Sequence, residues 1–226
     1  MPTTEKKISL LRSKFSNALL RPDLGAIVGV VLVFLFFFLV ARDTGMFSLE
    51  GSMNWGIVSS QFIIIAVGAC LLMIAGEFDL SVGSMIGFAG IIIAVTSVVW
   101  GWPVWLSIIA AFIVSMAIGG LIGYITVKTN LPSFIVSLAF LYILRGMTIF
   151  IAIISTKKTI IGGVTEVAEN DWLAPFFGGK IFTGVFDWLA EQGIIQTFVA
   201  GTKAGQPVVS GIPMMMVWAI GLVIFA

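Results

Sequence analysis

The stretch that decides the fold is Ala75-Gly76-Glu77-Phe78-Asp79-Leu80-Ser81-Val82-Gly83-Ser84. It places two carboxylates between two uncharged apolar runs, residues 55–75 and 82–100. Each run has about the twenty residues that a helix needs to cross a bilayer core of roughly 30 Å. One helix over all of 55–100 would be about 69 Å long, more than twice that thickness. We therefore expect a helical hairpin whose turn carries Glu77 and Asp79.

The composition is that of a polytopic membrane protein. Of the 226 residues, 59% are hydrophobic and 10% are charged, whereas a soluble domain has about 25% charged residues. No segment between the apolar runs has room for an ordinary soluble domain. The net charge is +1, and no basic patch with interleaved aromatic residues is present, so nucleic acid is not an expected partner.

The sequence offers little material for a cofactor or metal site. It has no histidine and one cysteine, Cys70, so the commonest metal ligand and an internal disulfide are both missing. The segment nearest to a phosphate-binding loop, Gly178-Gly179-Lys180, is followed by Ile181 and lacks the required spacing. We expect no cofactor and no ATP hydrolysis through such a loop.

Six apolar runs predict an all-α protein with about six membrane spans: residues 24–41, 55–75, 82–100, 103–127, 131–154 and 212–226. Five Lys and Arg residues in 1–23 place this N-terminal tail in the cytoplasm by the positive-inside rule. The tail has the periodicity of a surface helix, with a disordered tail as the alternative; its apolar positions are Ile8, Leu11, Phe15 and Leu19. Residues 24–226 then form the transmembrane domain.

On this topology residues 155–211 form an external segment. Within it, residues 187–193 read as a short helix that stops at Gly193. Its aromatic neighbours suggest that it lies on the outer membrane face or covers the bundle. The alternative is a flexible, solvated loop, which would be unusually long.

The polar residues of the turn and of the fifth span admit two uses each. In an extended turn Glu77 and Asp79 face one side, but no nucleophile and base accompany them, so a structural role is preferred to catalysis. Asp79 would accept bonds from free backbone N–H groups of a helix starting near Leu80 or Ser81, and such a break is a good hinge. Arg145 either extends to the outer interface or faces the bundle interior.

Two sequence blocks resemble a known family. Residues 76–84 match the pattern G-x-x-D-L-S-V-G-S of permeases of bacterial ABC importers for ribose, xylose and related sugars. Residues 131–138, followed by Leu144-Arg145-Gly146, resemble the block P-x-F-I-x-T-L…R-G of the same family, with Ser137 where Thr is common. Gly211-Ile212-Pro213 is a weaker third match. Together the matches cover residues 55–154 and 211–226 in the family's order.

The resemblance implies a permease in the bacterial inner membrane that pairs with a second permease copy, identical or not. ABC ATPase subunits would bind below it, and a periplasmic sugar-binding protein would deliver the sugar from above. It also suggests Gly76, Glu77, Asp79, Ser81 and Gly83 as a hinge, and Ser137 and Arg145 as pathway or gating contacts. Family members have roughly ten spans, so we expect this chain to be a fragment, a truncated product, or one part of a protein completed elsewhere. Its ATPase-coupling loop is not found.

Two other functional hypotheses stay open at this point. An ion-coupled secondary carrier would use Glu77 or Asp79 as a proton or cation site beside a broken helix. A non-transporting assembly or anchor protein would also fit a short chain. The external segment is longer than in ribose permeases, which leaves the sugar undecided.

Overall fold

The computed structural model describes residues 22–198 and 205–226, and all structural statements refer to these residues. They belong to two compact units, Met1–Asn54 and Trp55–Ala226. The first unit contains α2 (Pro22–Val40), the short 3-10 helix η1 (Arg42–Thr44) and the beginning of α3 (Leu49–Ile74). The predictions for the N-terminal tail, including its surface helix, lie outside the described residues.

The second unit contains the long helices and the external segment. It is made of the rest of α3, α4 (Val82–Ala94), the π-helical turn η2 (Val95–Val99), α5 (Val104–Thr129), α6 (Ser133–Thr156), α7 (Val164–Glu169), α8 (Ala174–Gly178), β1 (Lys180–Ile181), α9 (Thr183–Glu191), β2 (Ile212–Pro213) and α10 (Met214–Phe225). The two strands are antiparallel and have two residues each. The predicted helical fold is confirmed, and this small ladder is its one described sheet.

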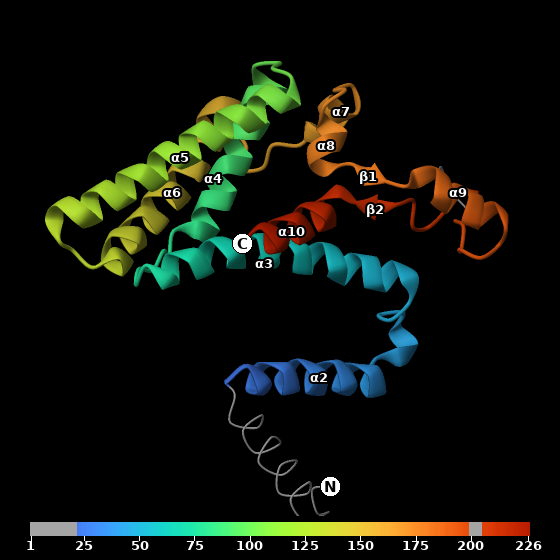
Figure 1. Ribbon diagram of the computed structural model, residues 1–226. Coiled ribbons are helices and arrows are strands. Elements are labelled where there is room, and N and C mark those ends of the chain that lie inside the picture. The colour runs from blue at the N-terminus through green and yellow to red at the C-terminus, as the bar shows by residue number, and fades with distance from the viewer. Residues whose placement is uncertain (1–21, 199–204) are drawn as a thin grey trace, which may run out of the picture. The chain divides into compact units, whose positions relative to one another are not determined.

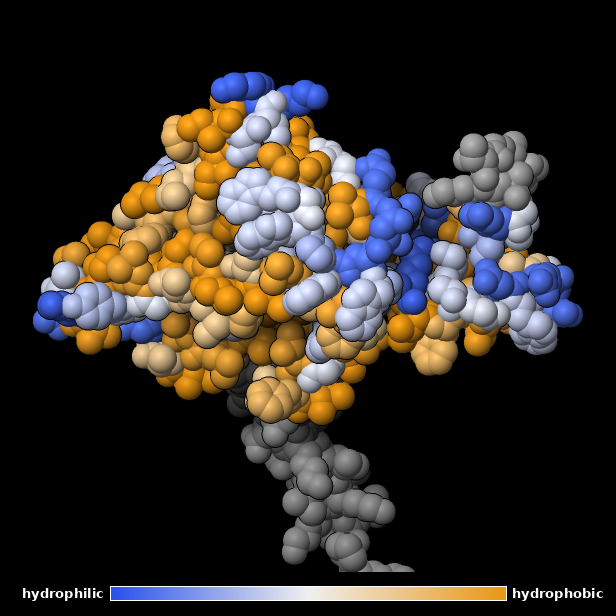
Figure 2. All heavy atoms as spheres, turned by 90° about the horizontal axis from the view of Figure 1, so that it is seen from above, coloured by the Kyte–Doolittle hydropathy of each residue, from blue (hydrophilic) through white to orange (hydrophobic). Residues whose placement is uncertain are grey.

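Helices are found at all six predicted spans. Four are long and apolar enough to cross a membrane: α3, α4 with η2, α5 and α6. The apolar helices at residues 24–40 and 214–225 are shorter. Figure 2 shows a face that is mostly hydrophobic, with hydrophilic residues gathered in a few clusters. Apolar surface of this extent is unusual on a protein surrounded by water.

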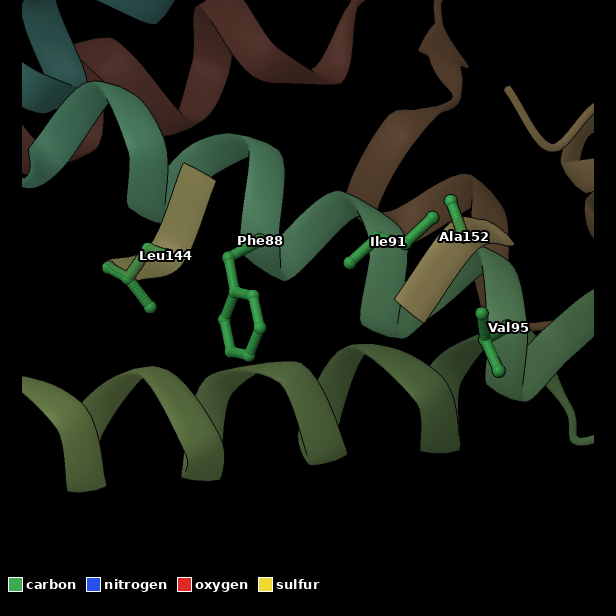
Figure 3. Close-up of a cluster of buried hydrophobic side chains, with 5 residues drawn as sticks. All are labelled: Phe88, Ile91, Val95, Leu144 and Ala152. Atoms are coloured by element: carbon green, nitrogen blue, oxygen red, sulfur yellow. The ribbon is translucent and has the colours of Figure 1, made fainter. Parts of the chain in front are cut away.

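The core of the second unit lies among α4, α5 and α6, which run side by side in Figure 1. Phe88, Ile91 and Val95 of α4 and η2 are buried together with Leu144 and Ala152 of α6 (Figure 3). Val114 and Ile118 of α5 pack against this cluster at its edge; they are partly buried. These three helices therefore form one packed body.

The described part of the external segment is folded, so the solvated-loop alternative is wrong there. The predicted short helix is present as α9, which starts at Thr183, earlier than predicted, and ends at Glu191. Gly193 follows with φ +71°, the left-handed conformation that stops a helix. The segment returns to the membrane helices through β1 and β2 and through a hydrogen bond from Trp218 Nε1 to the Phe176 carbonyl (3.1 Å).

Asp171 ties the external segment to the start of α5. Its Oδ2 accepts a hydrogen bond from the Trp105 N–H (3.2 Å), and its Oδ1 accepts one from the Leu173 N–H (3.0 Å). Desolvation raises the pKa of this carboxyl, but the amide donors of Leu173, Trp105, Val104 and Ala174 together bring it below its ordinary value of 3.8. A helix N-terminus has free N–H groups and a positive dipole, so it favours the ionised acid.

Replacing Asp171 with Asn should lower the thermal stability of the detergent-solubilised protein at pH 7. The lowered pKa means that the carboxylate stabilises the fold above pH 3.8 and that this contribution disappears as the pH falls through the folded-state value. The gap in melting temperature between wild type and Asp171→Asn should therefore close in acid. Asp187→Asn on the exposed side of α9 is the matched control and should change nothing. A gap that stays constant with pH would contradict a role for the charge.

Candidate functional site

The turn between α3 and α4, residues 75–81, is the candidate site and is called the signature turn below. It begins with a Schellman motif: the Glu77 N–H donates to the Leu72 carbonyl (3.1 Å) and the Gly76 N–H to the Met73 carbonyl (3.0 Å). Gly76 has φ +79°, a conformation that is free of strain for glycine but costs free energy for residues with a Cβ. The glycine therefore ends α3 and redirects the chain.

Asp79 binds the end of the same turn. Its Oδ1 accepts hydrogen bonds from the Ser81 N–H (2.7 Å) and from Ser81 Oγ (2.6 Å). The first helical bond then runs from the Met85 N–H to the Ser81 carbonyl (2.8 Å). The predicted bond from a backbone N–H to Asp79 is thus present, and α4 begins at Val82, next to the predicted start near Leu80 or Ser81. The carboxylate fixes the residue before the helix, not the amides of its first turn.

Two hydroxyls of α6, Ser133 and Ser137, bind the middle of the signature turn and are called the serine pair. Ser133 Oγ accepts a hydrogen bond from the Phe78 N–H (3.0 Å), and Ser137 Oγ accepts one from the Leu80 N–H (3.1 Å). Alternate residues of an extended segment point their N–H groups to one side, and residues four apart in a helix share one face. The two-residue spacing of Phe78 and Leu80 in the turn therefore matches the four-residue spacing of Ser133 and Ser137 in α6.

The carboxylates line a cavity on the α3 side of the turn. Glu77 and Asp79 are half-exposed, and both line this cavity of about 410 Å³ together with the last three turns of α3. Within the described residues no three His, Cys, Asp or Glu side chains come together as a metal site would require. The geometry supports backbone binding by Asp79 and leaves Glu77 available to solvent.

The two predicted pathway residues have different surroundings. Ser137 is fully buried and belongs to the serine pair, so the chain itself encloses it. Arg145 is exposed, next to the buried Leu144. The two residues are eight apart in α6, about 12 Å along its axis, and the structure does not bring them together. Gly83 lies exposed in the first turn of α4.

Sequence reasoning missed two contributions. The sequence pattern gives no sign of the role of Ser133, whose hydroxyl accepts a hydrogen bond from the Phe78 N–H of the turn. Asp171 was not singled out, and only its local bond to Leu173 could be expected, because an Asp commonly binds the N–H two residues on. Its bond to Trp105 joins residues 66 apart, and no sequence spacing indicates it.

The comparisons with known proteins agree with the motif. A family model described as "Branched-chain amino acid transport system / permease component" matches residues 52–226. The chain belongs to this permease family. The family consists of transport components, so the chain is a permease rather than an enzyme.

Relatives of the permease carry the names of several sugars. It is 31% identical over 161 residues to the xylose transport system permease protein XylH of Haemophilus influenzae, which covers 70% of this chain and 43% of the relative. It is 30% identical over 119 residues to the ribose import permease protein RbsC of the same organism, covering 53% and 36%. It is 37% identical over 123 residues to the fructose import permease protein FruF of Bifidobacterium longum, covering 54% and 33%.

Each of these alignments covers only part of the relative's own length. This permease aligns with between a third and about two fifths of their length. No solved structure matches the chain.

Substituting Gly76 with Ala should destabilise the permease by about 1–2 kcal/mol, because an L-residue is strained at this positive φ. Apart from Gly76 and its two chain neighbours, no residue comes within 4 Å of the added Cβ, so the cost is conformational and not steric. Gly83→Ala is the matched control: it also has open space, and alanine favours its helical conformation. Thermal unfolding in detergent should show a loss for Gly76→Ala, a smaller loss for Gly76→Asn, and none for Gly83→Ala. Equal behaviour of positions 76 and 83 would contradict the strain argument.

Proposed function

We propose that this chain acts as the transmembrane permease of an ATP-driven importer that moves a monosaccharide across the bacterial inner membrane. The observation that carries the proposal is the similarity to xylose, ribose and fructose permeases at 30–37% identity. The family description mentions branched-chain amino acids, but the relatives reported above are named for sugars. A neutral sugar also needs no counter-charge along its path, in keeping with the 10% of charged residues.

The partners follow from this function. ATPase subunits would bind the cytoplasmic side, a periplasmic sugar-binding protein would deliver the substrate, and a second permease copy would complete the path. The basic N-terminal tail would be cytoplasmic, which puts the signature turn on the cytoplasmic side and residues 155–211 outside. The aromatic turn at Trp100 and Trp102, whose rings are 5.6 Å apart, would then lie at the outer interface.

The mechanism would be alternating access. ATP-driven motion of the partner subunits would open the path outward and then inward, and the break at residues 76–81 would let the helices on either side change their angle. Hinges are a few residues at the ends of elements that absorb a change in φ and ψ. Gly76, Glu77, Asp79, Ser81 and Gly83 are the residues of this hinge.

Arg145 would line the path. It is the thirteenth of the 24 residues of α6, so about 18 Å of helix precedes it and about 16 Å follows. Its side chain is too short to reach either interface from there, and a charge at the bilayer centre costs about 2.5–3.5 kcal/mol when it faces lipid. The exposed guanidinium therefore needs water or a protein acceptor in the assembled transporter. Ser137, in contrast, would act on the path through the turn that it binds.

Uptake in glycolysing cells tests the proposed function. The chain, expressed with its ATPase and binding protein in a strain that lacks the permease, should import labelled xylose, ribose or fructose. ATP depletion should abolish uptake, and an uncoupler should not. The reverse pattern would indicate an ion-coupled carrier that uses Glu77 or Asp79. Competition by leucine but not by sugars would overturn the substrate class, and failure both to bind an ATPase subunit and to restore uptake would support an anchor protein.

Thiol accessibility tests the position of Arg145. In a Cys70→Ser background, Arg145→Cys should react with a charged, membrane-impermeant thiol reagent added to open membranes. Met116→Cys is the control, since Met116 is exposed at the centre of α5 and its replacement should face lipid and stay unreacted. Arg145→Met should reduce uptake at least tenfold at equal expression. An unreactive thiol in the Arg145→Cys variant, or full uptake by Arg145→Met, would contradict a place on the path.

A further inference from the structure

We propose that Ser133 and Ser137 are positioning residues that fasten the signature turn to α6, so that α3 pivots at Gly76 while the rest of the turn moves with α4 and α6. The proposal rests on the proposed transport function, which requires helices to change their relative angle. It narrows the proposed hinge from residues 76–83 to residues 76–77. It also assigns a structural role to the hydroxyls of Ser133 and Ser137.

The serine pair replaces hydrogen bonds that the turn cannot make by itself. Residues between two helices have N–H groups without helical partners, and such groups need other acceptors, above all in a membrane. Three of them, on Phe78, Leu80 and Ser81, donate to side-chain oxygens of Ser133, Ser137 and Asp79. Two of these three acceptors lie on α6. The extended part of the turn is therefore attached to α6 and not to α3.

The attachment point is rigid. Ser137 and Ser81 have relative exposures of 0% and 1%. Directly beyond them, α4 and α6 share the buried cluster of Phe88, Ile91 and Leu144 (Figure 3). Protein interiors are close-packed and resist small displacements. The turn from Phe78 onward, α4 and α6 therefore form one body.

Helix α3 is attached much more weakly. Within the described residues it buries one side chain, Ser60, whose hydroxyl donates to the Gly56 carbonyl of α3 itself. The cavity of about 410 Å³ separates its last turns, at Gly68 and Leu72, from Asp79 and Val82. The side of α3 that faces the turn thus has free space to move into.

Gly76 is the place where the two parts meet. Its positive φ of +79° ends α3, and no residue other than its two chain neighbours comes within 4 Å of the position where a Cβ would be. Glycine changes φ and ψ more freely than any other residue. The hydrogen bonds that attach the turn to Asp79 and to the serine pair start at Phe78, only two residues later. A change of angle between α3 and α4 is therefore concentrated at residues 76–77.

Amide hydrogen exchange of the whole chain in nanodiscs tests the serine pair. Ser133→Ala with Ser137→Ala should raise exchange at Phe78 and Leu80 at least tenfold. Ser137→Thr keeps the hydroxyl and should preserve protection of Leu80. Ser97→Ala is the matched control, because Ser97 is equally buried but binds the Ile93 carbonyl of its own helix. Unchanged exchange in the double variant, or an equal rise with Ser97→Ala, would overturn the proposal.

Spin-label distances test the pivot. The natural Cys70 lies exposed on α3, and a label there together with one at Tyr142→Cys measures the distance between α3 and α6. In a Cys70→Ser background, labels at Phe78→Cys and Tyr142→Cys measure the distance between the turn and α6. Both Tyr142 and Phe78 are exposed. The 70–142 distribution should be broad or shift between nucleotide states of the assembled transporter, while the 78–142 distribution stays narrow. The double serine variant should broaden the 78–142 distribution, and joint motion of both pairs in wild type would overturn the proposal.

These measurements separate the two proposals. If the wild-type chain imports no sugar and the exchange and distance results are as expected, the proposed function fails and the positioning role stands. If sugar uptake is present and the serine variants leave exchange, distances and uptake unchanged, the positioning role fails alone. Uptake should fall at least tenfold in the double variant Ser133→Ala with Ser137→Ala, and it should return when position 137 carries Thr instead of Ala. This result supports both the transport function and the positioning role.

Discussion

The structure depends on how seven residues between two membrane helices find partners for their backbone N–H groups. Inside the hydrocarbon core of a bilayer water is absent, and an unpaired group there costs several kcal/mol. At the signature turn the partners are supplied in three ways. The Schellman motif uses carbonyls of α3 for Gly76 and Glu77, the serine pair uses hydroxyls of α6, and Asp79 binds Ser81. The path of the chain follows from these acceptors.

The same principle organises the segment that follows α6. The first turn of α5 needs acceptors for its N–H groups, and Asp171 provides one from a segment 66 residues away. The external segment is thus attached to a membrane helix by a charge, and to α10 by β1, β2 and the Trp218 bond. At both ends of the bundle, a polar side chain from one element satisfies the backbone of another. Apolar packing among α4, α5 and α6 supplies the rigid body on which these bonds depend.

Asp79 and Arg145 are both charged residues within predicted functional motifs, but their side chains have different surroundings in the fold. Asp79 is used by the backbone, and its oxygen already has two donors, which weakens the case for a proton or cation site at this residue. Arg145 has a central position in α6 and an exposed side chain. In the proposed transporter its surroundings would therefore be polar. This makes the exposed face of α6 a better candidate for the proposed path than the signature turn.

Length and hydropathy were sufficient to predict the helical class, the positions of six apolar helices and the hairpin at residues 55–100, because the thickness of a bilayer sets the length of each run. The family could be predicted from two short motifs. The start of α4 at Val82 agrees with a helix expected to begin near Leu80 or Ser81. The pairing of Ser133 with Phe78, of Ser137 with Leu80 and of Asp171 with Trp105 required the tertiary structure. These bonds join residues 55 to 66 apart, and only the packing of α4 and α5 against α6 and the return of the external segment bring them within hydrogen-bonding distance.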